Sequence, residues 1–276
     1  MSIQKILVPV DFSVCSANAL QVAGQLTQAF KAELTILHAF QIPATHGEPG
    51  SASMVNGLSE EVENEAKQNL KEMLAEFHSF GHIHYKSLII HVYPTEAIES
   101  ALEKELFDLI VMGTRGSTGI EEKLIGSNTY SVIKNTTIPV LAIPQDQKIS
   151  DFTDIAFAGD YMKIEERGIF VVLLEICKFF NSTIHILHVD ENEENITTDE
   201  AFEARKFKQY FKNVNHNYFF INNSDIEAGI YEYLESHKIN LLVMIPRKHK
   251  VFERIFKESL TKKVACHAKI PLLSLT

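Results

Sequence analysis

Three glycines in the middle of the chain have a spacing that suits the binding of a phosphate group. Gly113 follows a short apolar run, Gly116 comes three residues later, and Gly126 stands just before a segment of helical period. Because glycine has no Cβ, a ligand can approach its main-chain N–H group closely. The first turn of a helix adds N–H groups without intrahelical partners, at the positive end of the dipole. The pattern G-x2-G-x9-G-S therefore predicts a phosphate cradle made of backbone, with Ser127 as the expected N-cap.

One acidic residue has a position that suits the binding of a sugar or a base. Asp11 directly follows the apolar run Ile6–Val10, which is the first expected strand. In open sheets of parallel strands, ligands bind beyond the carboxyl ends, where the strand order reverses. A carboxylate at that edge can accept hydrogen bonds from a ligand. The alternative is that Asp11 caps the following helix, although Ser13 is the better cap candidate.

The segment that holds the glycines occurs twice in the chain, but the glycines occur once. Val111–Ile143 aligns without a gap with Val243–Leu275, at an offset of 132 residues. The second copy has Ile245, Lys248 and Glu258 where the first has glycines. A β-branched side chain, a long cation and an acidic side chain each fit a phosphate cradle poorly. We therefore expect the first copy to bind a ligand and the second to keep only the fold.

The repeat extends over nearly the whole chain. Lys5–Ser13 has a counterpart in Asp154–Met162, which places Asp11 opposite Asp160. A length of 276 residues is enough for two domains of about 140 residues each. We expect these domains at residues 1–145 and 151–276, with the boundary near Pro144–Ser150.

Within each half, apolar runs rich in Val, Ile and Leu alternate with longer stretches of helical period. Apolar runs without polar alternation are typical of strands buried on both faces. The alternation of strands and helices predicts an α/β fold, with a doubly wound, mostly parallel five-stranded sheet in each half. The strands expected in the first half are Ile6–Val10, Leu34–Ala39, Ser87–His91, Leu109–Met112 and Val140–Ile143. The expected helices are Ala17–Phe30, Ser59–Phe80 with Ser59 as N-cap, Thr95–Glu105 and Ser127–Asn135, and Gln41–Ser59 is expected to be a mobile loop.

Composition limits the classes of function. The net charge of −10 argues against a general nucleic-acid-binding protein, so we expect no DNA partner. No apolar run approaches the ~20 residues that span a bilayer, and the N-terminus lacks the layout of a signal peptide. We therefore expect a cytoplasmic protein without a membrane partner. The basic segment 247–269 holds eight Lys and Arg against two Glu, and it is either a docking surface for an acidic protein or a solvated helix face.

The glycine segment resembles the ATP-binding signature of the universal stress protein family, and the whole chain resembles the tandem form of that family. The resemblance includes "VPVDFS" in the first strand, "LHAF" in the second and "IPVLAIP" in the last. It implies an adenine nucleotide alpha hydrolase-like fold and ATP as the ligand, with Mg²⁺ as an accompanying ion. By this resemblance, the nucleotide is bound by Pro9, Val10 and Asp11 beside the nucleoside, Ala39 in the adenine pocket, Met112, Gly113, Arg115 and Gly116 along the ribose and phosphates, and Gly126, Ser127, Asn128 and Thr129 at the phosphates.

The function implied by the resemblance is a nucleotide-dependent regulator of the stress response with little or no ATP turnover. No catalytic residue and no set of metal ligands is recognisable from spacing. A slow ATP-hydrolysing or adenylating enzyme and a nucleotide-free interaction scaffold are the alternatives.

Single-domain members of the resembled family dimerise through their last strands. In this chain the corresponding apolar runs are "IPVLAI" and "IPLLSL", which would expose unpaired backbone groups if they were edges. We expect these two strands to pair antiparallel within one chain and to join the halves as a pseudo-twofold pair. A homodimer of the whole chain remains open.

Overall fold

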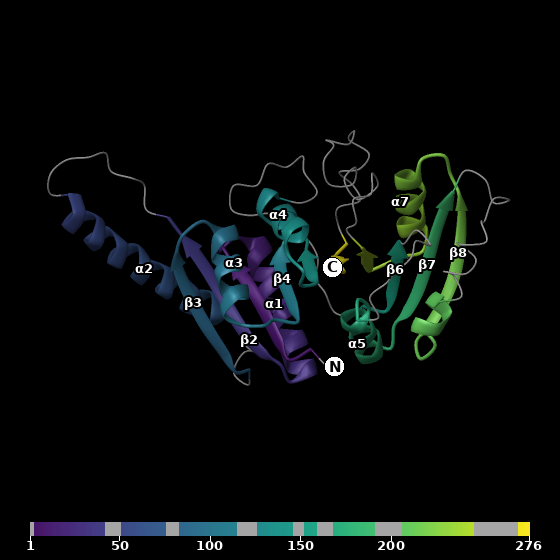
Figure 1. Ribbon diagram of the computed structural model, residues 1–276, viewed down its shortest axis with the longest axis horizontal. Helices are drawn as coiled ribbons and strands as arrows, with labels where there is room; N and C mark the ends of the chain where they lie inside the picture. Colours follow the sequence, from purple (N-terminus) through teal and green to yellow (C-terminus); the bar gives the residue numbers. More distant parts are fainter. Residues whose placement is uncertain are drawn as a thin grey trace.

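The computed structural model describes residues 3–41, 51–75, 83–114, 126–145, 152–158, 168–190, 206–245 and 270–276. A single ten-stranded sheet runs through both halves, from β3 at one edge to β8 at the other, and helix α2 extends beyond β3 (Figure 1). The strand order is β3-β2-β1-β4-β5-β10-β9-β6-β7-β8. The second half thus repeats the first in mirrored order about the β5–β10 pair, which confirms the expected pair of doubly wound sheets.

The strands of the first half match the expected runs to within two residues. They are β1 (Lys5–Val10), β2 (Glu33–Phe40), β3 (Tyr85–His91), β4 (Leu109–Gly113) and β5 (Val140–Ile143), and the helices are α1 (Val14–Phe30), α2 (Ser51–Ala75), α3 (Pro94–Lys104) and α4 (Ser127–Asn135). The second half contains β6 (Asp154–Ala158), α5 (Val171–Phe180), β7 (Thr183–Asp190), β8 (Asn215–Asn222), α7 (Ile226–Ser236), β9 (Leu241–Met244) and β10 (Leu272–Ser274).

Helix α2 begins earlier than expected. It starts at Ser51, so Ser59 lies inside the helix and is not its N-cap. The expected loop is therefore helical from Ser51 onward, and its residues 42–50 lie outside the described part of the chain. The missed signal is an apolar residue at every fourth position: Met54, Leu58, Val62, Ala66, Leu70 and Leu74. Apolar residues that recur at such a spacing favour a helix, and the Ser, Asn and Gly residues between them favoured a loop.

The sheet separates two helical layers. Ile6 and Val8 of β1 pack in one core cluster with α1 and α5, whereas Leu7 packs on the other face with α3, α4 and α7. This alternation follows from the two-residue period of a strand. Residues of both halves, such as Ile6 and Ile155, belong to the same cluster. The two halves therefore share one continuous core on the α1 side of the sheet.

The halves are joined by their last strands, as expected. Strands β5 and β10 pair antiparallel, with Leu141 opposite Leu273, and both side chains are fully buried. On the α1 side, the rings of Phe30 and Phe179 lie 5.8 Å apart between centroids, which adds a contact between α1 and α5.

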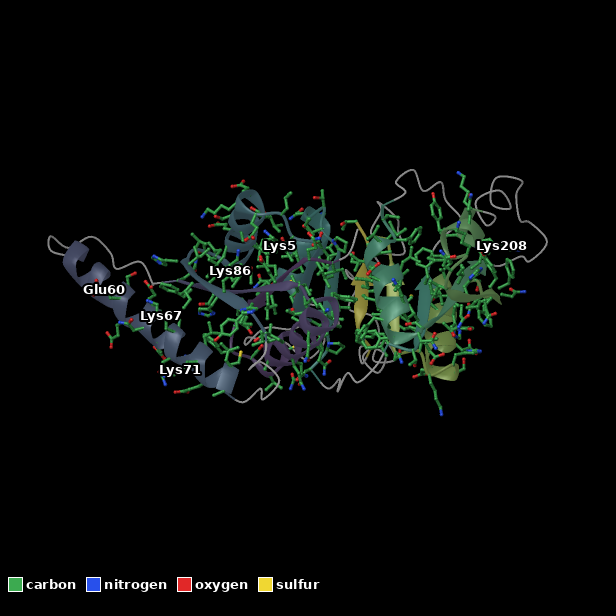
Figure 2. All side chains as sticks on the ribbon, turned by 90° about the horizontal axis from the view of Figure 1, so that it is seen from below. Lys5, Glu60, Lys67, Lys71, Lys86 and Lys208 are labelled. Carbon is green, nitrogen blue, oxygen red and sulfur yellow. The ribbon has the colours of Figure 1, made fainter. Side chains whose placement is uncertain are left out.

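Ion pairs fix the end of α3 at the amino edge of the sheet. Lys5 Nζ lies 2.7 Å from Glu105 Oε1, and Lys86 Nζ bonds Glu105 Oε2, so one carboxylate links α3 with β1 and β3. The two lysines are labelled in Figure 2. Hydrogen bonds from these two lysines hold the pKa of the Glu105 carboxyl below its usual range. Exposed pairs of this kind add little stability. Their role is to position α3, whose other end lies at the carboxyl edge.

The buried β5–β10 pair predicts a strong effect of one substitution. Leu273→Ala should lower the free energy of unfolding by about 2–5 kcal/mol, because the methyl groups lost leave a cavity in the shared core. Leu106→Ala is the matched control, since Leu106 is 86% exposed, and it should change stability by less than about 0.5 kcal/mol. Urea denaturation of the whole chain measures both values. Equal stability of the two variants would contradict a joint core at this junction.

Candidate functional site

The direction of winding reverses between β1 and β4. Strand β1 pairs with β2 on one side and with β4 on the other, and all three strands are parallel. Their carboxyl ends lie at the same edge, so Asp11 and Thr114, which directly follow β1 and β4, lie at the switch point. The structure therefore brings together two of the predicted elements, the acidic residue and the start of the glycine segment.

Asp11 is held by the turn that leads into α1. Its Oδ1 accepts the N–H of Ser13 at 3.1 Å and the hydroxyl hydrogen of Ser13 at 2.5 Å. The Ser13 hydroxyl oxygen in turn accepts the N–H of Ser16 at 3.2 Å. Ser13 is thus the N-cap of α1, as expected. Asp11 supports the cap from outside the helix, and its half-buried carboxylate has a fixed place beside the crevice.

Phe12, between Asp11 and Ser13, has an unusual backbone conformation. Its φ is 61°, in the left-handed region that bulky side chains rarely adopt. Its ring packs on the His38 imidazole with the centroids 4.4 Å apart. His38 Nδ1 donates to the carbonyl oxygen of Val10 at 2.8 Å. These contacts keep the connection from β1 to α1 short and fixed.

Gly113 has a packing role that the sequence did not reveal. A Cβ at this position would lie 2.9 Å from the backbone carbonyl carbon of Cys15 and 3.1 Å from its Sγ. Contacts below 3.0 Å require the backbone to shift, so only glycine lets the end of β4 lie against the first turn of α1. Gly113 is therefore needed for packing whether or not a ligand binds.

The corresponding helix of the second half begins later. Helices α1 and α5 both end just before a left-handed residue, Lys31 or Asn181, so their C-termini correspond. From this common end, α1 extends back over 17 residues but α5 over only 10. Gly168 to Phe170, just before α5, form turns. At the position that corresponds to Gly113, the second half has Ile245, which packs partly buried against the core.

Helix α4 begins at the same edge. Its N-cap is Gly126, with φ −66° and ψ 158°, and not Ser127 as expected. The Gly126 N–H donates to Thr114 O at 2.5 Å, and the Gly126 carbonyl accepts the N–H of Tyr130 at 3.0 Å. The N–H groups of Ser127, Asn128 and Thr129 belong to the first turn of α4 and have no acceptor within the helix. The cap residue supplies no side-chain hydrogen bond to them, so this turn can bind an anion through backbone.

Thr129 joins the two parts of the site. Its buried hydroxyl donates to the carbonyl oxygen of Gly113 at 2.7 Å. This bond ties α4 to the end of β4, so a phosphate contact from Thr129 would use its backbone N–H. Ser127 and Asn128 are exposed beside it.

The remaining predicted residues fall into two groups. Val10 and Met112 are buried at the ends of their strands, and Pro9 and Ala39 are partly exposed. Ala39 and Met112 pack on the α3 side of the sheet. Arg115, Gly116, Asp160 and the basic segment 247–269 lie outside the described residues, and their roles stay predictions. Within the described ranges, no three His, Cys, Asp or Glu side chains are placed to hold a metal ion.

Another cluster of titratable side chains lies at the amino edge of the second half. His185 Nδ1 is 2.8 Å from Tyr233 Oη, and His185 Nε2 is 3.6 Å from Asp154 Oδ1. The ring of His237 stacks on Tyr233 with the centroids 3.8 Å apart. Burial lowers the pKa of His185, against the opposing effect of Asp154, and raises the pKa of Tyr233 to about 12. The cluster is remote from the crevice and anchors the end of α7.

Comparison with known proteins supports both the sequence pattern and the fold. The model of the universal stress protein family matches residues 2–144. Universal stress protein MJ0531 of Methanocaldococcus jannaschii is 35% identical over 147 residues, which cover 52% of this chain and 84% of the relative. YxiE of Bacillus subtilis is 30% identical over 148 residues, 50% of this chain and 97% of the relative. The crystal structure of a universal stress protein from Archaeoglobus fulgidus covers 99% of this chain and 98% of its own, with a TM-score of 0.66 at 18% identity, which shows the same fold over both halves.

The contact between Gly113 and Cys15 predicts a stability effect that does not depend on a ligand. Gly113→Ala should lower the free energy of unfolding by about 1–3 kcal/mol in nucleotide-free buffer, because the added methyl group must push α1 away from β4. Gly168→Ala is the matched control, since a Cβ there meets nothing within 4 Å. Urea denaturation compares the two. An unchanged stability for Gly113→Ala would mean that the glycine serves the ligand alone.

The lowered pKa of His185 predicts a pH dependence of stability. As the pH falls below the ordinary histidine range of about 6.5, the unfolded chain takes up this proton before the folded chain does. The stability associated with neutral His185 is therefore present above that range and lost as the pH falls toward the folded pKa. The wild type should lose stability more steeply between about pH 7 and pH 5 than His185→Gln, and exposed His84 provides the control His84→Gln. Equal slopes in thermal unfolding would contradict this role.

Proposed function

The chain belongs to the universal stress protein family, and from this premise we propose that the carboxyl edge of its first half binds ATP and that the protein acts as a nucleotide-dependent regulator with little or no turnover. The observation that carries the proposal is that Asp11 and the first turn of α4 both lie at the carboxyl edge of the sheet, around the β1–β4 switch point. A carboxylate and a set of backbone donors at one crevice suit a ligand with hydroxyl groups at one end and phosphates at the other.

Electrostatics fix the direction in which ATP would lie. Phosphates are favoured at the start of α4, where the N–H groups of the first turn and the helix dipole attract an anion. The Asp11 carboxylate would repel phosphates but can accept hydrogen bonds from ribose hydroxyls or from the amino group of adenine. The nucleoside end therefore lies toward β1 and β2. There Ala39 and Met112 supply apolar surface on the α3 side of the sheet.

The side chains of the crevice favour binding over turnover. Cys15 is buried, with its Sγ 3.2 Å from the carbonyl oxygen of Ile143. His38 is buried on the α1 face with its Nδ1 bonded to Val10. The Asp11 carboxylate accepts hydrogen bonds from the backbone N–H and from the hydroxyl group of Ser13. Hydrolysis needs a base that can activate a water beside the terminal phosphate, and none of these three groups is placed at the start of α4.

The oxygen atoms at the start of α4 determine how Mg²⁺ could be bound. This ion prefers oxygen ligands and is often bound through substrate phosphates and one or two protein groups. The exposed Ser127 hydroxyl at the first turn of α4 is the described oxygen that fits such a role. Mg²⁺ would then arrive with the phosphates of ATP.

The second half has a different part in this proposal. Its β9 ends next to Ile245, where the first half has Gly113, and its helix α5 begins only at Val171. We place the limits of the two domains at residues 1–145 and 151–276, with the nucleotide in the first. The protein would act in the cytoplasm, and within the described residues no helix has the length and apolar character to cross a membrane.

Paired substitutions test the proposal. Asp11→Asn keeps an oxygen that can accept the hydrogens of Ser13 but removes the charge, so the fold should be retained. It should weaken ATP binding about tenfold, since hydrogen bonds to a charged group contribute more than neutral ones. Asp160→Asn, the equivalent change in the second half, should leave the affinity unchanged. Calorimetric titration of the whole chain measures each affinity.

Three outcomes would overturn parts of the proposal. Equal losses in the two variants would mean that both halves bind ATP. A wild-type protein that gives no heat with ATP, and that releases no nucleotide when denatured, would instead be an interaction scaffold. Steady phosphate release at a rate set by enzyme concentration would favour the ATP-hydrolysing alternative.

A further inference from the structure

Tyr93 is a large aromatic residue at the carboxyl edge that the core does not use. Its side chain is 58% exposed. Its backbone is nevertheless fixed, because Tyr93 is the N-cap of α3, its carbonyl oxygen accepts the N–H of Ala97 at 2.9 Å, and Pro94 follows at the first helical position. Pro at this position is preorganised for the helix. The ring is therefore carried by a backbone that has a fixed place on the edge.

The residues around Tyr93 form an apolar wall on the α3 side of the sheet. Strand β2 pairs with β3 in a register that sets Ala39 beside Ile90. Ala39, Ile90 and Val92 are each partly buried against the same core cluster. Below them, Leu37 of β2 and Ile98 of α3 belong to that cluster as well. Tyr93 therefore stands at the outer end of this wall, directly after Val92.

The spacing of the strands places this wall within reach of a nucleotide. Neighbouring strands lie about 4.8 Å apart, so β3 is about 14 Å from β4, with β1 and β2 between them. Phosphates at the start of α4 and a ribose beside Asp11 would leave the base over β2 and β3. Helices α3 and α4 pack against each other on this face, so both helix starts border the same crevice.

From this arrangement we propose that the ring of Tyr93 stacks on the base of the bound nucleotide. This inference rests on the proposed function, because it needs the phosphates at α4. A planar base offers a π face to an aromatic ring, and such stacking is tolerant of base identity. The site would therefore select nucleotides over inorganic polyphosphates of equal charge, through a contact that no phosphate group makes.

Strand β3 supplies a matched control. Tyr85 begins β3 at the amino edge and is 46% exposed, so it shares the residue type and a similar exposure with Tyr93, which follows the other end of this strand. It lies at the other end of the strand from the crevice. A general effect of removing an exposed tyrosine would appear at both positions, whereas a contact with the base would appear at one.

Calorimetric titration of the whole chain with ATP and with inorganic tripolyphosphate tests the proposal. Tyr93→Ala should weaken ATP about tenfold, the size of effect measured when one stacking ring is removed. Its affinity for tripolyphosphate should equal that of the wild type, because the first turn of α4 is unchanged. Tyr93→Phe keeps the ring and should bind ATP within about twofold of the wild type, and Tyr85→Ala should not differ from it.

The possible failures are distinguishable. A wild type that binds neither ATP nor tripolyphosphate would overturn the proposed function. If the wild type binds ATP and Tyr93→Ala binds it equally well, the proposed function stands and the stacking is overturned. Equal losses of ATP and tripolyphosphate in Tyr93→Ala would also overturn it, since they would show a displaced helix and not a lost base contact. A Tyr93→Phe variant that binds ATP as weakly as Tyr93→Ala would also overturn the stacking.

Discussion

The close packing of the end of β4 against the first turn of α1 determines the geometry of the whole carboxyl edge. Gly113 is the centre of this packing. Its missing Cβ admits the backbone of Cys15, and its carbonyl oxygen accepts the hydroxyl of Thr129. One residue thus sets the positions of both α1, which carries the turn with Asp11, and α4, which offers its first-turn N–H groups. Because the turn before α1 is only three residues long, Phe12 must adopt a left-handed conformation, and its ring contact with His38 supports it.

The two halves keep a common sheet but differ where a ligand would bind. The order of strands, the antiparallel β5–β10 pair and the shared core are symmetric features, and they depend on apolar runs present in both copies. Relative to their common C-terminal end, α5 begins later than α1, and Ile245 stands where the first half has Gly113. The internal repeat therefore keeps the residues that hold the sheet together, and the described differences lie at the carboxyl edge.

The sequence predicted the strands well because a buried parallel strand is a local signal. The runs Val140–Ile143 and Leu109–Met112 are apolar without interruption, and the structure places both in the centre of the sheet. Helix starts were harder to predict. Ser127 was chosen as a cap for its side chain, but Gly126 caps α4 because β4 and Thr114 hold it there.

The residues that were misjudged depend on contacts between distant segments. Phe220 is a large apolar residue of a strand, yet it is 47% exposed because β8 is the last strand in the sheet order. The contact of Gly113 with Cys15 joins residues 98 positions apart, and no spacing in the sequence indicates it.

The candidate site also shares a strand with the junction of the halves. Ile143, the last residue of β5, accepts the N–H of Thr114 at 2.9 Å and the thiol of Cys15 at 3.2 Å, while the other side of β5 pairs with β10. A strand supported on both sides resists displacement, so the part of the candidate site that rests on β5 is held in place by the sheet. The second half thereby supports the carboxyl edge of the first.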